Sequence, residues 1–394
     1  MSDPWLSIIG IGEDGLNGLP RASSDALDAA EVVFGAVRHL EFAQIEAVRG
    51  RPWPVPFSTA PLLALRGQRV AVLASGDPFW FGAGGSLARD LHPAEWQAFP
   101  AASTFSRICA ALGWRVEVTT CLGLHATQLS GARPHLHHGR HVIALVADAA
   151  QARDFATYLT DLGFGASPLW VAEAMGGPRQ RVRRVQTDAP LPEDIATPVA
   201  IAVHLQGPSG LPRSSGLEDD LFLHDGQITK RPIRALALSA LAPRPGEHLW
   251  DIGAGSGSIS VEWCLAGGTA LAFEAQIDRA LRIGQNAAAF GVTKSLQVVQ
   301  GHAPATLAGL PQPDAIFLGG GATDLLVAEL WNRMPPGCRL VVHAVTLETE
   351  SLLMGWHARV GGDLMRIDIA EAAPLGRMRG WDRARPVVQW RVVR

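Results

Sequence analysis

The segment 249–257, Leu-Trp-Asp-Ile-Gly-Ala-Gly-Ser-Gly, limits the possible folds of this chain more than any other part. An apolar run typical of a buried strand ends in Asp251 and is followed by glycine at every second position. Because glycine has no Cβ, such a turn lets backbone N–H groups approach a ligand closely. A dinucleotide-binding turn has the spacing Gly-x-Gly-x-x-Gly, which this segment lacks. The segment predicts a strand, a tight loop and a helix that bind a different nucleoside ligand; an ordinary glycine-rich turn is the alternative.

The sequence after residue 230 alternates short apolar runs with helical stretches, which predicts a doubly wound, mostly parallel α/β sheet. The expected strands cover residues 248–252, 271–274, 296–300, 315–318 and 339–345, and the expected helices cover 233–241, 258–264, 278–290 and 325–334. Ligands of such sheets bind at the carboxyl ends of the strands. Small or polar residues follow four consecutive expected strands, at 253–257, 274, 302–303 and 319–321.

The first half shows the same alternation and predicts a further α/β domain. Its expected strands cover residues 5–10, 32–34, 70–73, 142–146, 169–172 and 199–203, with helices at 24–30, 85–91, 106–112 and 149–162. Residues 206–220 are rich in glycine, proline and serine, which interrupt periodic structure. We therefore expect one domain over 1–205, a linker over 206–220 and a second domain over 221–394.

Composition excludes several classes of protein. A chain of 394 residues with 47% hydrophobic and 18% charged residues is long and apolar enough for two globular cores. The net charge of −3 argues against a nucleic-acid partner. The sequence has neither an apolar run of 18 residues nor a signal-peptide pattern, so we expect no membrane partner and a cytoplasmic location. The four cysteines form no Cys-x-x-Cys pair, and the histidine-rich stretch 134–141 is interpreted as a polar loop, so no metal site is expected.

The glycine pattern Asp-x-Gly-x-Gly-x-Gly resembles motif I of S-adenosylmethionine (AdoMet) methyltransferases, which implies AdoMet as the cofactor. Glu274 ends the next expected strand, where the resemblance implies hydrogen bonds to the ribose hydroxyls. His302 stands where many methyltransferases have an acid that contacts the adenine, so backbone groups of His302 and Ala303 are expected to contact the base. The cofactor residues expected in this loop are Asp251, Gly253, Ala254, Gly255, Ser256 and Gly257.

Residues 224–231, 314–321 and 343–350 resemble, in order, segments of the CbiT-type corrin methyltransferases and decarboxylases. The resemblance implies a Rossmann-like methyltransferase fold and adds Thr229 to the AdoMet-binding residues. The glycines at 319–321 leave space where a flat, bulky acceptor approaches the sulfonium, and Gly320 is counted with the catalytic residues. Glu348 and His343, beside the last parallel strand, are the candidate acid–base groups; a solvated loop is the alternative for the glutamate.

In the first half, residues 8–15, 74–78 and 100–106 resemble the tetrapyrrole methylase family, most closely its CbiE branch. That family holds AdoMet in a cleft between two α/β subdomains, and this chain departs from its Gly-x-Gly-Pro-Gly turn by having Glu13-Asp14. The resemblance implies cofactor contacts from Gly10, Gly12, Gly76, Asp77, Ser103 and Thr104. Residues 121–126 resemble a further segment of the branch, where His125 is either a substrate contact or a packed histidine.

A CbiE-like half followed by a CbiT-like half resembles the family of fused, decarboxylating methyltransferases of precorrin. This implies methylation of C5 and C15 of the macrocycle, loss of carbon dioxide from the ring C acetate, and a homo-oligomer. Arginine binds carboxylates with paired hydrogen bonds, so the substrate residues expected are Arg231, Arg377, Arg379 and Arg383. A solvated basic hairpin or a subunit contact is the alternative for the last three. The competing functions are a single-site methyltransferase of another substrate with a non-catalytic first domain, a nicotinamide-dependent oxidoreductase and a non-enzymatic scaffold.

Overall fold

A computed structural model describes residues 4–394. The chain forms two compact units, each described by itself. Unit 1 comprises the chain up to residue 127 together with residues 135–208, and unit 2 comprises residues 128–134 and 209–394. Within the described residues no helix is long and apolar enough to cross a membrane. No group of three or more His, Cys, Asp or Glu side chains is arranged to hold a metal ion among these residues.

Unit 1 begins with a parallel five-stranded sheet in the order β3-β2-β4-β1-β5. Its strands are β1 (Leu6–Ile11), β2 (Val32–Gly35), β3 (Gly50–Pro52), β4 (Val70–Ser75) and β5 (Trp96–Phe99). Helices α1 (Arg21–Asp28) and α2 (Val37–Phe42) cover one face, and α3 (Ala60–Leu63) and α4 (Gly84–Leu87) cover the other. Successive strand residues point to opposite faces, so Ile8 joins one core and Ile9 the other.

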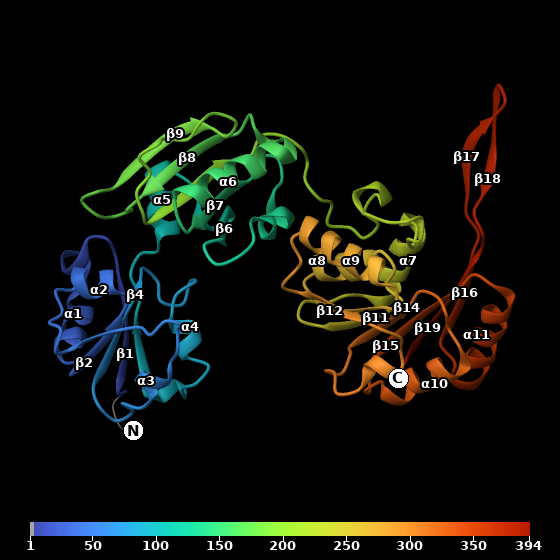
Figure 1. The fold of residues 1–394 in the computed structure, drawn as a ribbon, viewed down its shortest axis with the longest axis horizontal. Helices are drawn as coiled ribbons and strands as arrows, with labels where there is room; N and C mark the ends of the chain where they lie inside the picture. The colour runs from blue at the N-terminus through green and yellow to red at the C-terminus, as the bar shows by residue number, and fades with distance from the viewer. Residues whose placement is uncertain (1–3) are drawn as a thin grey trace. The chain divides into compact units, whose positions relative to one another are not determined.

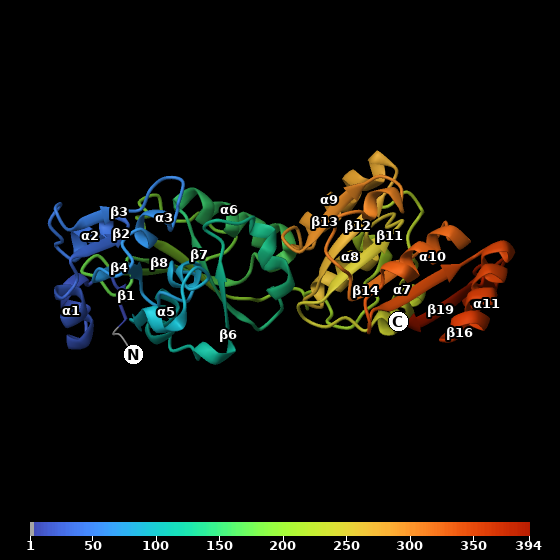
Figure 2. The ribbon, with the colours of Figure 1, turned by 90° about the horizontal axis from the view of Figure 1, so that it is seen from below.

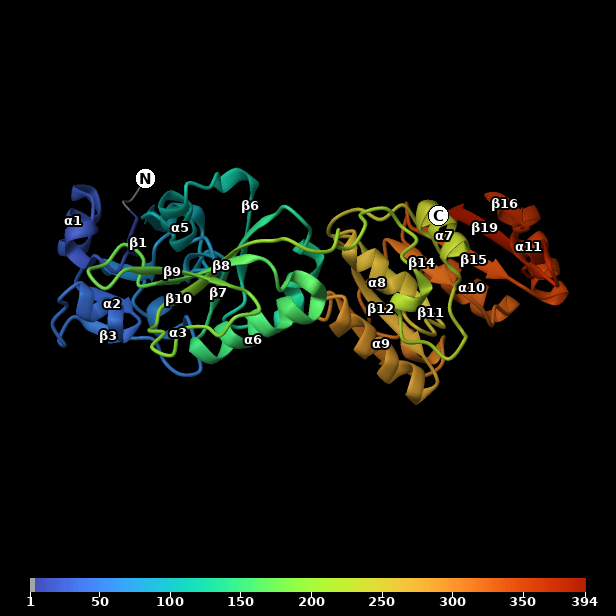
Figure 3. The same cartoon turned by 90° about the horizontal axis from the view of Figure 1, so that it is seen from above.

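The second part of unit 1 is a mixed sheet in the order β6-β7-β10-β8-β9. Its strands are β6 (Thr119–Gly123), β7 (His141–Val146), β8 (Pro168–Glu173), β9 (Arg181–Gln186) and β10 (Val199–His204). Only β6 and β7 are parallel; the other neighbours are antiparallel. Helices α5 (Thr104–Leu112) and α6 (Ala149–Leu159) lie on opposite sides of this sheet (Figures 2 and 3).

Unit 2 is built on a seven-stranded sheet in the order β13-β12-β11-β14-β15-β19-β16. Its strands are β11 (His248–Ile252), β12 (Thr269–Glu274), β13 (Leu296–Gln300), β14 (Ala315–Leu318), β15 (Arg339–Ala344), β16 (Asp363–Ile367) and β19 (Val387–Val393). The first five of these strands are parallel, and β19 runs antiparallel to both of its neighbours. The chain order reverses between β11 and β14, and ligands of open α/β sheets bind at such a switch point.

Helices cover both faces of this sheet and make unit 2 a three-layer domain (Figure 1). One face carries α7 (Arg231–Leu241), α8 (Ser258–Leu265) and α9 (Ile277–Ala289), and the other carries α10 (Asp324–Arg333) and α11 (Leu347–Val360). Trp263 and Phe317 lie in the first core, and Trp250 and Trp390 lie in the second. The predicted fold class, a tetrapyrrole-methylase-type α/β half followed by a Rossmann-like methyltransferase half, is confirmed.

A two-stranded hairpin, β17 (Ala370–Leu375) and β18 (Met378–Arg383), projects from the body of unit 2 (Figure 1). It connects β16 to β19, the last two strands of the sheet, and β19 lies beside β15. Leu375, Met378 and Trp381 are exposed on it. The hairpin roots, rather than its tip, therefore meet the carboxyl ends of the parallel strands.

Candidate active sites

The glycine loop of unit 2 connects the end of β11 to the start of α8, as the sequence predicts. Gly253, Gly255 and Gly257 have φ values of +69°, +60° and +74°, a region that favours glycine. A Cβ on Gly257 would lie 2.7 Å from the Ile283 side chain, so this glycine lets α9 pack closely. The other two line a cavity, where the absence of side chains exposes backbone groups to a ligand.

The cavity of unit 2 has a volume of about 1070 Å³ and lies at the carboxyl edge of the sheet. Its walls come from the ends of β11, β12, β14 and β15, from residues 227–233 and from the hairpin roots. The predicted site residues that line it are Thr229, Arg231, Gly253, Ala254, Gly255, Glu274, Gly320, His343 and Arg383. Nine predicted residues, spread over more than 150 positions of the sequence, are thus brought to one cavity.

Glu274 lies at the end of β12 with its carboxylate tied to the glycine loop. Its Oε2 accepts a hydrogen bond of 2.9 Å from the Gly255 N–H, and its Oε1 accepts one of 2.9 Å from the Gln276 N–H. A carboxylate has about four acceptor positions, so one remains on each oxygen for a ligand hydroxyl. The two backbone donors fix the carboxylate at the cavity edge, a geometry suited to a vicinal diol.

Three predicted cofactor residues lie behind the loop and do not line the cavity. Asp251 is buried, accepts a 2.6 Å hydrogen bond from Ser260 Oγ, and has its pKa raised to about 6 by burial. The carbonyl of Ser256 accepts a 2.8 Å hydrogen bond from Asn286 Nδ2, and Gly257 packs as described above. These three residues shape the loop from behind the cavity wall.

His302 and Ala303 follow β13 but do not line the cavity either. His302 is exposed, and Ala303 packs against the core beneath α10. Their expected backbone contact with the adenine stays a prediction.

Unit 1 has its own cavity, with a volume of about 770 Å³. It lies where the parallel sheet meets the mixed sheet of the same unit. The predicted residues that line it are Gly12, Gly76, Asp77, Ser103, Thr104 and His125. Gly10 does not line it: a Cβ there would stand 1.9 Å from the Gly76 carbonyl oxygen, so this glycine allows β1 to approach the loop after β4.

Two of these residues organise the turns around them. Asp77 Oδ1 accepts a 2.9 Å hydrogen bond from the Phe79 N–H, the geometry of an Asx turn. Ser103 is the N-cap of α5, and its Oγ accepts a 3.1 Å hydrogen bond from the Ser106 N–H. The loops after β4 and β5 therefore present backbone groups to the cavity from fixed positions.

A charged cluster that the sequence did not predict surrounds the Glu13-Asp14 turn. Glu13 forms ion pairs with Arg38 (3.2 Å) and Arg179 (3.6 Å), and Asp14 pairs with Arg107 at 2.9 Å. Arg38 and Arg107 line the cavity. The two acids that replace the usual Pro-Gly thus hold arginines at the cavity, and only the departure from the family pattern signalled them.

His39, which follows Arg38 in the sequence, forms a 2.9 Å hydrogen bond between its Nε2 and Ser75 Oγ. Burial, with a smaller contribution from the Arg38 charge, lowers the pKa of His39 to about 4. The imidazole is therefore neutral at pH 7 and contributes a hydrogen bond, and no charge, to this side of the cavity.

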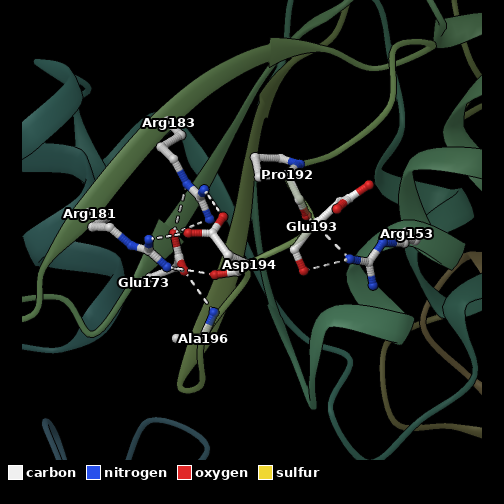
Figure 4. A network of polar contacts seen from close by, with 8 residues as sticks. All are labelled: Arg153, Glu173, Arg181, Arg183, Pro192, Glu193, Asp194 and Ala196. Atoms are coloured by element: carbon white, nitrogen blue, oxygen red, sulfur yellow. Dashed lines mark hydrogen bonds and ion pairs between the residues drawn. The ribbon is translucent and has the colours of Figure 1, made fainter.

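A polar network fixes the far wall of the unit 1 cavity (Figure 4). The buried carboxylate of Glu173, at the end of β8, accepts hydrogen bonds from Arg181 (2.7 Å), Arg183 (3.1 Å) and the Ala196 N–H (2.8 Å). Asp194 bridges the same two arginines. The network ties residues 194–196 to the β8–β9 pair, and Arg153 of α6 holds the carbonyls of Pro192 and Glu193 (Figure 4). Ala172 and Pro198, which lie close by in the sequence, line the cavity.

Comparison with known proteins gives the family. The family model of the tetrapyrrole (corrin/porphyrin) methylases matches residues 6–190, and that of the precorrin methyltransferase domain matches residues 220–394. The chain is 48% identical over 397 residues to the precorrin-6Y C(5,15)-methyltransferase (decarboxylating) of Sinorhizobium sp, with 98% of this chain and 96% of the relative covered. This chain belongs to that family. It is therefore a methyltransferase, and the predicted family and enzyme class are confirmed.

Two further relatives of this methyltransferase are informative. The protein of the same name from Mycobacterium tuberculosis is 40% identical over 402 residues, covering 99% of this chain and all of the relative. A shorter protein from Saccharolobus solfataricus, named as a probable cobalt-precorrin-6B C(15)-methyltransferase (decarboxylating), is 34% identical over 165 residues, or 40% of this chain and 81% of the relative. A methyltransferase family implies AdoMet as the methyl donor.

The candidate catalytic residues of the methyltransferase are separated by the structure. His343 lines the unit 2 cavity, bonds Gln389 Oε1 through Nε2 at 2.9 Å and meets the Phe317 ring edge-on. Burial lowers the pKa of His343, so it is neutral at pH 7. Glu348, in contrast, lies in the exposed first turn of α11 and does not line the cavity, because the helix begins directly after β15 and carries it away.

The predicted substrate arginines are likewise divided between the cavity and the hairpin. Arg383, at the root of β18, lines the cavity with Arg385. Arg377 and Arg379 are exposed near the hairpin tip and do not line it. Arg231 lines the cavity and forms an ion pair with Glu218.

Sequence reasoning missed a pair of acids at the hairpin root. Glu371 and Asp382 are cross-strand partners of β17 and β18, and both line the cavity beside Arg383. The sequence predicts a basic, substrate-binding segment here, with a solvated basic hairpin as the alternative, and the pairing that brings these two acids together is seen only in the structure.

Proposed function

We propose that this chain transfers two methyl groups from AdoMet to precorrin-6B, at C5 and C15, and releases carbon dioxide from the ring C acetate to give precorrin-8 in cobalamin biosynthesis. The observation that carries the proposal is the presence of two separate glycine-loop cavities in one chain of this family. In each transfer the bond from sulfur to the methyl carbon breaks as a new carbon–carbon bond forms, and S-adenosylhomocysteine leaves.

The unit 2 cavity is assigned to C15 methylation and decarboxylation. AdoMet would lie along residues 253–255, with Glu274 accepting hydrogen bonds from its ribose. The relative named as a C(15)-methyltransferase (decarboxylating) aligns with only 165 residues of this chain, which supports placing both steps in one unit. Gly319 and Gly320 line the cavity without side chains, which leaves room for a macrocycle next to the donor methyl group.

The unit 1 cavity is assigned to C5 methylation. Its glycine turn, the loop at Gly76-Asp77 and the cap at Ser103 are the parts that would hold AdoMet. Arg38 and Arg107 would meet the acetate and propionate groups of the substrate, because guanidinium groups bind carboxylates with paired hydrogen bonds. His125 lies on the same cavity and is assigned to the substrate.

Methyl transfer requires little acid–base chemistry from these residues. The reaction is an in-line displacement, so holding donor and acceptor collinear in a closed site supplies most of the rate enhancement. In decarboxylation the carbon–carbon bond to the carboxylate breaks, its electron pair enters the conjugated ring system, and the remaining carbon takes up a proton. Glu371 and Asp382, which line the cavity beside Arg383, join His343 as the candidate proton donors at this cavity, and Glu348 is set aside because it lies at the surface.

The test is incubation of the purified chain with precorrin-6B and AdoMet carrying a ¹³C methyl group. Mass analysis should show a product with two labelled methyl groups and one carbon dioxide fewer. Transfer of a single methyl group at saturating AdoMet would favour the single-site alternative, and no transfer to precorrin-6B would contradict the proposal.

A further inference from the structure

A segment of unit 2, residues 216–231, forms one wall of the cavity; we call it the strap. Gln227, Thr229 and Arg231 of the strap line the cavity. A Cβ built on Gly255 would lie 3.4 Å from the Gln227 carbonyl oxygen, so the strap passes directly over the glycine loop. The only regular element inside it before α7 is the short turn Asp219–Leu221. Something other than backbone ladders must therefore hold it in place.

Arg234 of α7 holds two distant points of the strap at once. Its side chain has 0% exposure, and its Nη1 donates to the Thr229 carbonyl at 2.5 Å and to Asp219 Oδ1 at 2.9 Å. Its Nη2 donates to the Leu217 carbonyl. One guanidinium thus fixes the beginning of the strap and the residue on the cavity wall.

Glu262 of α8 forms the second part of this attachment. Its buried carboxylate accepts hydrogen bonds from Arg234 Nε (2.6 Å) and from the backbone N–H groups of Gly216 (2.6 Å) and Leu217 (3.0 Å). The buried charge of Arg234 is therefore paired through Nε, and both Nη groups donate to the strap. Unpaired buried charges are costly, so this arrangement disfavours any other strap position.

Asn286 of α9 joins the strap to the glycine loop. Its side chain is fully buried. Its Oδ1 accepts from the Leu223 N–H at 2.8 Å, and its Nδ2 donates to the carbonyls of Leu223 (2.9 Å) and Ser256 (2.8 Å). Three of the four hydrogen-bonding positions of this amide are thus used on the two walls of the cavity.

The middle of the strap is held by charge. Asp225 pairs with Arg279 at 2.9 Å and Arg282 at 3.2 Å, both on α9, while its Oδ1 accepts a 3.1 Å hydrogen bond from the Gln227 N–H. Hydrogen bonds from Arg279 and from the backbone hold the pKa of Asp225 far below its usual range. The carboxylate stays charged at all working pH values.

We propose that Arg234 and Asn286 are positioning residues for AdoMet, which keep the strap in its binding conformation before the ligand arrives. Neither residue lines the cavity. A wall that is already ordered loses little conformational entropy when the ligand binds, so preorganisation raises affinity without a new contact. The inference rests on the proposed function, because it takes AdoMet as the ligand of this cavity.

The test compares two buried arginines of unit 2 in the full chain. Arg234→Met removes the strap bonds. Arg339→Met is the matched control, because Arg339 is also buried and bonds the Leu241 carbonyl at 2.6 Å and Glu247 at 2.5 Å, away from the strap and the cavity. The titration calorimetry with AdoMet is done at a temperature at which circular dichroism shows that each variant is folded. The affinity of unit 2 for AdoMet should fall by about tenfold or more in Arg234→Met and should not change in Arg339→Met. The affinity of unit 1 in the same titration is the internal control.

Steady-state kinetics separates positioning from general damage. Arg234→Met and Asn286→Leu should raise KM for AdoMet in C15 methylation while kcat is regained at saturating AdoMet. Asn286→Leu should also increase amide hydrogen exchange of residues 222–228, and AdoMet should suppress this increase. Arg234→Lys, which keeps the charge and part of the donor set, should recover part of the lost affinity.

A milder variant decides the matter if Arg234→Met does not fold. Asp225→Asn keeps the bond to the Gln227 N–H, weakens the pairing with α9, and should lower AdoMet affinity about two- to threefold. Wild-type affinity in both Asp225→Asn and Asn286→Leu would overturn the positioning role. An unmodified chain that binds no AdoMet in unit 2 would instead overturn the proposed function.

Discussion

The two units build their cavities from the same first wall and from different second walls. In both, glycine turns follow parallel strands and open backbone groups toward a cavity at the carboxyl edge of the sheet. In unit 1 the opposite wall is a second sheet, and aromatic side chains such as Trp53, Trp80 and Phe105 line the space. In unit 2 the opposite wall is the strap and the hairpin root, and charged side chains predominate.

This difference determines which residues each site depends on. The second wall of unit 1 is regular structure locked by the Glu173 network, whereas that of unit 2 is an irregular segment locked by single buried side chains. Since no residue lines both cavities, a substitution should impair one methyl transfer and spare the other. The following predictions test this independence.

The largest effect is expected from Gly255→Leu. Residue 255 has a φ of +60°, and a side chain there would extend into the cavity beneath the strap. Binding of AdoMet to unit 2 should be lost, and the product of incubation with precorrin-6B should carry at most one added methyl group with its acetate retained. Two added methyl groups in mass analysis would contradict the separation of the two sites.

Ala102→Trp is the mirror experiment in unit 1. Ala102 is exposed and lines the cavity, so a large ring would fill the space at little cost to folding. Calorimetry should show one AdoMet bound per chain, with the affinity that unit 2 has in the unmodified chain. A parallel loss of binding in unit 2 would show that the sites are coupled.

Glu274→Ala should weaken AdoMet binding to unit 2 by about 1.5–3 kcal/mol, the usual scale for a hydrogen bond to a charged group. Part of the loss comes from freeing the Gly255 N–H, which the carboxylate now holds at 2.9 Å. Titration of the full chain measures both sites, and the affinity of unit 1 should not change. An unchanged affinity in unit 2 would refute the assignment of Glu274 to the ribose.

Acid should act on the stabilities of the two units with opposite sign through two buried groups. The pKa of His39 is lowered from 6.5 to about 4, so between these values the unfolded state takes up the proton and unit 1 loses stability as the pH falls. The pKa of Asp251 is raised from 3.8 to about 6, so the folded state takes up the proton and unit 2 gains stability over that range. Each contribution is limited to about 1.4 kcal/mol per pH unit.

The measurement is the pH slope of thermal unfolding, compared with the unmodified chain. His39→Gln should flatten the loss of stability of unit 1 between pH 6.5 and 4. Asp251→Asn, whose amide oxygen still accepts from Ser260, should steepen the acid loss of unit 2. Slopes that move the other way would show that burial does not set these pKa values.

The smallest effect distinguishes the root of the hairpin from its tip. Arg383→Ala, at the cavity, should raise KM for the precorrin several-fold with little change in KM for AdoMet. Arg377→Ala, exposed near the tip, should leave both values as they are. Equal effects of the two substitutions would show that substrate carboxylates reach the whole hairpin.

The central strands could be predicted from sequence because burial on both faces makes them continuous apolar runs. The predicted strand at 248–252 coincides with β11, and that at 70–73 lies within β4. No strand is predicted for the edge strand β9, Arg-Val-Arg-Arg-Val-Gln, and the hairpin at 370–383 is predicted only as an alternative. Their side chains are largely solvated, so pairing with a neighbour, which no local pattern records, determines their structure.

The residues of the candidate sites also divide into those that the local sequence marks and those that it does not. Local chemistry marks the glycine loops and Glu274, since a turn with positive φ needs glycine wherever the chain folds. Nothing local marks Arg234 or Asn286 as buried, because a polar residue in a helix is usually solvated. Glu348 was expected beside the cavity, but α11, which was not predicted, carries it to the surface.

The central claim is that one chain holds two independent sites for the methyl donor, and the most direct measurement is the stoichiometry of AdoMet binding. Titration calorimetry of the full chain, repeated with Gly255→Leu and with Ala102→Trp, should give two AdoMet molecules per chain and then one for each variant. The affinity that remains in each variant should equal one of the two seen in the unmodified chain. A single AdoMet per unmodified chain, or the loss of both sites in either variant, would contradict the account.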